Sequence, residues 1–179
     1  MPFITTPIDG VIIFEPKVFH DDRGYFFESY NERLFAQNGI NAKFVQDNQS
    51  KSSYGVIRGL HFQKGEHAQA KLVRVLSGKV LDVAVDLREG SKTFGRHVAT
   101  ELSAENNLSL FIPRGFAHGF SVLSETAVFS YKCDNLYCKE AEGGLDLTDP
   151  DLAIDWKIPV EKAILSEKDK HHPRFKECY

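Results

Sequence analysis

No apolar run in the sequence approaches the roughly 20 residues that a membrane-spanning helix requires. The chain also lacks a basic excess: its formal net charge is −3, which creates no field for general nucleic-acid binding. The net charge does not exclude a local basic pocket that binds a phosphorylated small molecule. The first ten residues contain neither the positive region nor the apolar core of a secretory signal, so we expect a cytoplasmic protein.

Cysteine, methionine and tryptophan are all scarce, with three, one and one copies. The cysteines, Cys133, Cys138 and Cys178, are odd in number, and the spacing of the first two matches no zinc knuckle. We therefore expect reduced thiols and no strong nucleophile among them. The 14 phenylalanines and 6 tyrosines, in contrast, favour β-strands.

Short β-forming runs punctuated by glycine and proline dominate the chain and predict an all-β sandwich or barrel. Strands are predicted over 11–16, 25–30, 43–45, 68–76, 79–87, 96–102, 108–112, 119–123 and 127–133. Asn31 is expected to cap one helix over 32–38, and Ser166 a short one over 166–170. The polar segment 46–50 is predicted to be a loop. We see no repeat or linker, so we predict a single domain over 1–179.

Two of these runs flank Ser77-Gly78 and predict a tight hairpin in which Leu76 pairs with Lys79 and Val75 with Val80. In that register both faces of the pair carry apolar residues. One face would hold Lys71, Val73, Val75, Val80, Asp82 and Ala84, and the other Leu72, Arg74, Leu76, Leu81, Val83 and Val85. A pair covered on both sides needs a further packed layer, for which a second subunit is a natural candidate.

The segment 55–74 is unusually rich in ionisable side chains for a β-forming stretch. An ordinary buried strand would avoid them because unpaired buried charge is costly, so the segment predicts a polar ligand site. His61 stands near a strand end, where a general base reaches a pocket. A lone histidine is more often structural. Its neighbours Lys71 and Asp82, a cation and a carboxylate, favour proton chemistry beside a developing oxyanion.

The sequence PRGFAH over 113–118 resembles the second motif of the cupin superfamily, a jelly-roll barrel. Metal-binding cupins carry H-x-H plus a glutamate in the first motif, since a divalent metal needs several convergent ligands. Here Gln63 stands two residues after His61. The resemblance therefore implies a cupin without a metal, in which Glu66 and His67 belong to a solvated loop.

A more specific resemblance covers nearly the whole chain. Seven phrases carry it: FHDDRGYFFE over 19–28, FVQDNQS over 44–50, RGLHFQ over 58–63, KLVRV over 71–75, DVAVDLR over 82–88, IPRGFAHGF over 112–120 and LSEKD over 165–169. Together they are similar, in order, to the dTDP-4-dehydrorhamnose 3,5-epimerase family. The resemblance implies a homodimeric, cofactor-free isomerase that epimerises a dTDP-linked 4-keto-6-deoxy sugar at C3 and C5 in dTDP-rhamnose biosynthesis.

By this resemblance His61 is the base, and Asp169 orients and stabilises its imidazolium. Tyr131 is the matching acid on the opposite face of the sugar, although strand alternation alone would place it in the core. Lys71 holds the enolate oxygen. Asp169 also fits a capping box with Ser166, and both roles can hold.

The family pattern places Arg58 and His118 in the same pocket. Because strict alternation would put Arg58 opposite His61, we expect a bend at Gly59. The same pattern implies that the nucleotide is bound by Arg23, Glu28, Gln46, Asn48 and Phe19. Phe19 would stack on the base across the dimer interface. In each case the alternative is ordinary turn chemistry.

Three other functions compete with the 3,5-epimerase. A mono-epimerase or ketoisomerase of another nucleotide-linked 4-keto-6-deoxy sugar would differ only in small features of the pocket. A non-catalytic sugar-nucleotide binder is disfavoured because His61, Lys71, Tyr131 and Asp169 are all present. A metal-dependent cupin oxygenase is disfavoured by Gln63.

Overall fold

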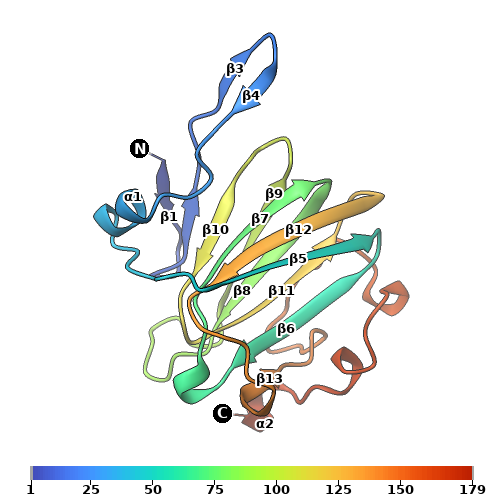
Figure 1. Ribbon diagram of the computed structural model, residues 1–179. Coiled ribbons are helices and arrows are strands. Elements are labelled where there is room, and N and C mark those ends of the chain that lie inside the picture. Colours follow the sequence, from blue (N-terminus) through green and yellow to red (C-terminus); the bar gives the residue numbers. More distant parts are fainter. Residues whose placement is uncertain (1, 179) are drawn as a thin grey trace.

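The computed structural model describes residues 2–178 and is built mainly from two antiparallel sheets that face each other (Figure 1). The larger sheet has the order β1 (Phe3–Thr5), β2 (Ile12–Phe14), β10 (Ser109–Ile112), β7 (Lys71–Ser77), β12 (Thr126–Cys133) and β5 (Gln46–Ser53). The smaller has the order β13 (Glu142–Gly144), β6 (Ile57–Gln63), β11 (Phe116–Val122), β8 (Lys79–Asp86) and β9 (His97–Ser103). The mostly-β prediction is confirmed. Within the described residues the two sheets are not joined into a closed barrel.

Helices are few and short, as predicted. They are α1 (Glu32–Gln37), α2 (Phe175–Cys178) and the 3-10 turns η1 (Gly65–His67), η2 (Lys139–Ala141), η3 (Val160–Lys162) and η4 (Asp169–His171). Asn31 caps α1 by accepting a 3.0 Å hydrogen bond from the backbone N–H of Leu34. Across residues 2–178 no helix has the length and apolarity needed to span a membrane. The three cysteines are free thiols.

The hydrophobic core lies between the sheets and is extended on both outer faces. Val73 on β7 and Val80 on β8 belong to the inner cluster. The outer face of β8 packs against the C-terminal segment, whose Trp156 is 1% exposed. The outer face of the larger sheet is covered in part by α1 through Phe35. The predicted extra layer on β8 is therefore real, but the same chain supplies it and no second subunit is needed there.

The predicted hairpin at Ser77-Gly78 is wrong. Strand β7 pairs with β10 and β12, whereas β8 pairs with β9 and β11, so the turn carries the chain from one sheet to the other. The predicted inward group still holds, because Val73 and Val75 meet Val80 and Ala84 across the sandwich. The predicted outward group is wrong, because Leu72 packs on the outer face of the larger sheet, whereas the outward residues of β8 pack on the outer face of the smaller one. Alternation alone does not distinguish these two arrangements.

The predicted loop over 46–50 is also wrong, because these residues begin strand β5, which pairs with β12 at the edge of the larger sheet. The strand is polar, but its burial alternates: Ser52 is buried, and Gln46, Asn48 and Ser50 are half-buried. The strand predicted over 25–30 is shorter than expected, because β4 (Gly24–Phe26) ends at Phe26, and the strand predicted over 43–45 does not form. Together with β3 (Phe19–Asp21), β4 forms a hairpin that projects from the body of the molecule (Figure 1).

Gly59 provides the bend that the sequence requires. Its φ is +123°, and the register between β6 and β11 shifts between His118 and Phe120. A Cβ at Gly59 would lie 2.5 Å from the Cα of Gly119, so a side chain there would force β6 and β11 apart. The bend lets Arg58 and His61 line the same cavity, and this expectation is confirmed.

Candidate active site

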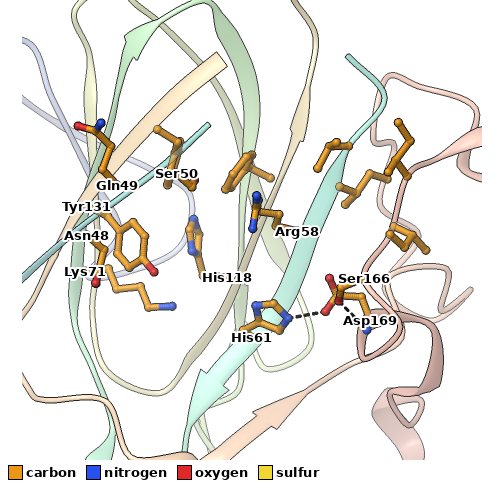
Figure 2. A pocket seen from close by; sticks show the side chains of 16 residues that line it. Asn48, Gln49, Ser50, Arg58, His61, Lys71, His118, Tyr131, Ser166 and Asp169 are labelled. Atoms are coloured by element: carbon orange, nitrogen blue, oxygen red, sulfur yellow. Dashed lines mark hydrogen bonds and ion pairs between the residues drawn. The ribbon is translucent and has the colours of Figure 1, made fainter. Parts of the chain in front are cut away.

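A cavity of about 490 Å³ opens between the two sheets (Figure 2). It is lined by seven of the eleven residues that the sequence analysis proposed for the site: Asn48, Arg58, His61, Lys71, His118, Tyr131 and Asp169. The smaller sheet contributes Arg58, His61 and His118 through β6 and β11. The larger sheet contributes Asn48, Lys71 and Tyr131 through β5, β7 and β12. A ligand in the cavity would therefore meet different side chains on its two faces.

His61 and Asp169 form the closest polar contact in this cavity, with 2.5 Å between His61 Nε2 and Asp169 Oδ1. The Asp169 side chain is 3% exposed, whereas that of His61 is 33% exposed. Burial alone would raise the pKa of Asp169, but the hydrogen bond and charge of His61 outweigh it and lower the pKa. An ionised carboxylate only accepts hydrogen bonds, so Nε2 of His61 is the donor in this contact. In the neutral ring that carries its proton on Nε2, the lone pair lies on Nδ1.

The local fold places Asp169 at this position. The Oγ of Ser166 accepts a 3.2 Å hydrogen bond from the backbone N–H of Asp169, which opens η4. The predicted helix over 166–170 with Ser166 as its cap is wrong, because η4 begins at Asp169 and its N-cap is Lys168, which makes no side-chain cap. The hydrogen bond from Asp169 to Ser166 remains, and it coexists with the contact between Asp169 and His61.

A second histidine-carboxylate pair lies deeper in the site. His118 Nε2 is 2.9 Å from Asp82 Oδ2, and both side chains are buried. Burial lowers the pKa of His118 despite the opposing charge of Asp82, so the ring is neutral at pH 7. The sequence analysis noted Asp82 only as a neighbour of His61, and the structure assigns it to His118. A carboxylate in an otherwise apolar strand was the available signal.

Lys71 and Tyr131 lie on neighbouring strands, with Lys71 Nζ 5.9 Å from the centre of the Tyr131 ring. Burial lowers the pKa of Lys71, while the negative charges of Asp82 and Glu142 favour its protonated form. Burial raises the pKa of Tyr131, so its phenol keeps its proton at neutral pH. The site therefore places an amine and a protonated phenol opposite His61.

The polar residues at the cavity edge hold one another in place. Arg58 Nε donates a 3.1 Å hydrogen bond to Ser52 Oγ, a partner that the sequence analysis missed. Asn48 Oδ1 accepts a 3.2 Å hydrogen bond from Gln46 Nε2. Gln46 itself does not line the cavity but lies beside it, and its Oε1 accepts a hydrogen bond from the backbone of Tyr137.

Besides Gln46, three predicted nucleotide residues lie outside this cavity. Arg23 is at the tip of the β3–β4 hairpin, 89% exposed and paired with Asp21. Phe19 and Glu28 line a separate open cavity of about 580 Å³ beside α1. Within one chain these residues are therefore not brought together with His61.

The residues around the cupin-like first motif serve structural roles. Gln63 Oε1 accepts a 2.9 Å hydrogen bond from the backbone N–H of Cys138. His67 and Glu66 form an exposed pair with 3.8 Å between charged atoms. None of the three lines the main cavity.

His172 is a further residue that the sequence analysis missed. It follows η4, and its Nε2 lies 3.5 Å from Asp169 Oδ1, on the side of the carboxylate away from the main cavity. Burial lowers the pKa of His172, and the nearby His61 lowers it further. His172 follows Asp169 by three residues, and this spacing is the sequence feature that could have indicated their contact.

Comparison with known proteins gives consistent matches over nearly the full chain. The family model described as dTDP-4-dehydrorhamnose 3,5-epimerase matches residues 5–177. A curated dTDP-4-dehydrorhamnose 3,5-epimerase from Methanothermobacter thermautotrophicus is 51% identical over 176 residues, covering 98% of this chain and 95% of the relative. A crystal structure of the same enzyme from Elizabethkingia anophelis NUHP1 superposes with a TM-score of 0.94 at 63% identity, covering 98% of this chain and 96% of that one.

A further solved structure carries a bound ligand. It is dTDP-6-deoxy-D-glucose-3,5-epimerase from Legionella pneumophila Philadelphia 1 in complex with dTDP-4-keto-L-rhamnose. It superposes with a TM-score of 0.93 at 48% identity and covers 97% of this chain and 92% of that one.

Proposed function

This chain belongs to the dTDP-4-dehydrorhamnose 3,5-epimerase family, and on that premise we propose how its pocket carries out the family's reaction. The reaction is an isomerisation of a nucleotide sugar: dTDP-4-dehydro-6-deoxy-D-glucose becomes dTDP-4-dehydro-L-rhamnose by inversion at C3 and C5. The C4 carbonyl acidifies the C–H bonds on both neighbouring carbons, so a base can remove a proton and leave an enolate. No cofactor is needed in this proposal.

His61 is the proposed base. Its Nε2–H is held by Asp169 at 2.5 Å, which leaves Nδ1 as the nitrogen that accepts the substrate proton. The imidazolium that forms is stabilised by the buried carboxylate, as in other histidine-aspartate pairs. The single observation that carries the proposal is this pair, on the wall of a cavity whose opposite wall presents Tyr131 and Lys71 (Figure 2).

Inversion requires a proton to leave one face of the sugar ring and another to arrive on the opposite face. His61 belongs to the smaller sheet and Tyr131 to the larger one, so a ring bound between the sheets has the base and the acid on opposite sides. Tyr131 donates the second proton, which its raised pKa keeps available. His118, with Asp82, and Arg58 complete the sugar pocket.

Lys71 stabilises the enolate oxygen in this proposal, and its removal should slow the chemical step. For Lys71→Met we expect kcat to fall by about 10²- to 10³-fold, the usual effect of losing one oxyanion donor, with a much smaller change in KM. The exposed Lys51 on β5 offers a matched control, because Lys51→Met removes the same charge outside the cavity. Steady-state kinetics check both variants, and an unchanged kcat in Lys71→Met would remove Lys71 from the mechanism.

The nucleotide site requires a second protomer in this proposal. Arg23, Glu28 and Phe19 lie on or next to the β3–β4 hairpin, which projects from the body of the molecule (Figure 1), and none of them lines the chain's own cavity. We therefore propose a cytoplasmic, single-domain homodimer with a cupin-type jelly roll, in which the hairpin of one protomer reaches the cavity of the other. There Arg23 binds the diphosphate and Phe19 stacks on the base, next to Asn48 and Gln46.

Removing the Arg23 guanidinium should weaken substrate binding more than catalysis. For Arg23→Ala we expect KM to rise about 10- to 100-fold, since hydrogen bonds to charged groups typically contribute about 1.5–3 kcal/mol, with little change in kcat. Mixing Arg23→Ala with His61→Ala protomers then tests the exchange of hairpins. If hairpins cross, the mixed dimer regains one intact site and activity at low substrate; if each protomer uses its own hairpin, mixing restores nothing.

A further inference from the structure

His172 has no role in the proposed proton transfers, yet its ring is held tightly beside Asp169. Its side chain is 9% exposed, and its Nε2 is buried without a hydrogen-bond partner among the described residues. The 3.5 Å from Nε2 to Asp169 Oδ1 is too long for a good hydrogen bond. Gly144 makes room for the ring, because a Cβ there would lie 2.3–2.5 Å from three ring atoms. A buried, unpaired imidazole nitrogen of this kind is costly unless something binds it.

His172 belongs to a cluster of three side chains, with His61 and Asp169, whose ligand atoms suit one metal ion. One ring nitrogen of His172, one ring nitrogen of His61 and a carboxylate oxygen of Asp169 all lie within 4.8 Å of one another. Nε2 is the nitrogen of each ring that lies next to Asp169 Oδ1. Two imidazoles and a carboxylate are the ligand types that Zn²⁺ takes, and ligand atoms around a tetrahedral Zn²⁺ are about 3.4 Å apart. Side-chain shifts of about 1 Å would give that arrangement. The partly exposed His61 leaves the fourth position open towards the main cavity.

We propose that His61, Asp169 and His172 bind one divalent transition ion such as Zn²⁺, and that this ion inhibits the enzyme. The inhibition rests on the proposed role of His61 as base. A metal on Nε2 takes the place of the proton shared with Asp169, and the single proton of the neutral ring moves to Nδ1. Nδ1 then has no lone pair to accept the proton from the substrate. The ion would act as a reversible inhibitor, and no catalytic step uses it.

The site can be tested without substrate by titrating untagged protein with Co²⁺ and following its visible absorption. We expect one ion per chain in the wild-type protein and a Kd at least about tenfold weaker in His172→Ala. His171→Ala is the matched control, because His171 is an exposed neighbour outside the cluster, and it should bind Co²⁺ like the wild type. A thiolate-to-cobalt absorption band would place the ion on a cysteine instead and would overturn the proposal.

Inhibition is measured separately, as the Zn²⁺ concentration that halves each variant's own metal-free rate, with recovery by a chelator. We expect His172→Ala to need at least about tenfold more Zn²⁺ than the wild type or His171→Ala. His172→Gln serves as a second variant if the alanine protein unfolds. No stoichiometric binding, or equal binding in His172→Ala, overturns the site, whereas binding without inhibition overturns the inhibitory role. Failure of the proposed base would instead appear as retained turnover in metal-free His61→Ala.

Discussion

His61→Ala should lose about 10²- to 10⁴-fold in the rate of solvent deuterium exchange into the substrate, the range typical of removing a general base. The reason is that the remaining cavity contains no other group placed like His61, with a buried carboxylate 2.5 Å from its far nitrogen. His118, the other histidine lining the cavity, already pairs with Asp82 in a buried position and cannot take its place without moving. Proton NMR of the sugar in deuterated water measures the rate directly.

Two controls separate loss of the base from loss of the fold. Affinity for dTDP should stay largely intact in His61→Ala, because the proposed nucleotide contacts come from other residues. His67→Ala removes a histidine from the same segment, outside the cavity, and should exchange at the wild-type rate. Retained turnover in His61→Ala would show that another residue is the base.

Tyr131→Phe should separate proton removal from inversion. The base is intact in this variant, so we expect deuterium to enter the substrate on the face that His61 serves. Formation of the inverted product should fall by about 10²- to 10⁴-fold, because the acid on the opposite face is missing. NMR distinguishes labelled starting sugar from inverted product in one experiment. Tyr137→Phe, which alters an exposed tyrosine on the loop after β12, should behave like the wild type.

The pH dependence provides an independent check on Tyr131. Burial raises the pKa of its phenol above the ordinary value of 10.0, so the protonated form that donates is present at all lower pH values. The wild-type inversion rate should therefore show little loss from Tyr131 between pH 7 and about 9, and its decline should have a midpoint above pH 10.0. A decline centred near pH 8 with no change in stability would contradict this assignment.

The side chains that carry the proposed chemistry of the cavity could be predicted from the sequence better than the strands that form the cavity. Residues His61, Lys71, Tyr131 and Asp169 lie together as the motifs indicated. The turn at Gly78 could not be interpreted correctly, because a hairpin and a crossing between facing sheets leave the same alternation of apolar residues. Strand β5 was predicted to be a loop because polar runs ordinarily indicate loops. Its inward side chains are polar because they line the cavity.

Contacts made by residues distant in sequence were the second class of error. Asp82 belongs to His118 because β8 and β11 are paired, and no spacing along the chain predicts that pairing. The β3–β4 hairpin shows the opposite limit: its motif was recognised, but the motif does not indicate that Arg23 and Phe19 lie outside the chain's own cavity.

Deuterium incorporation by the wild-type protein tests the central claim most directly. The protein is incubated with dTDP-4-dehydro-6-deoxy-D-glucose in deuterated water, and the sugar is followed by NMR. The account predicts deuterium at both C3 and C5 of an inverted product, because base and acid lie on opposite walls of one cavity. Deuterium at a single carbon would instead indicate a mono-epimerase, and no incorporation after long incubation would contradict the proposed chemistry for this substrate.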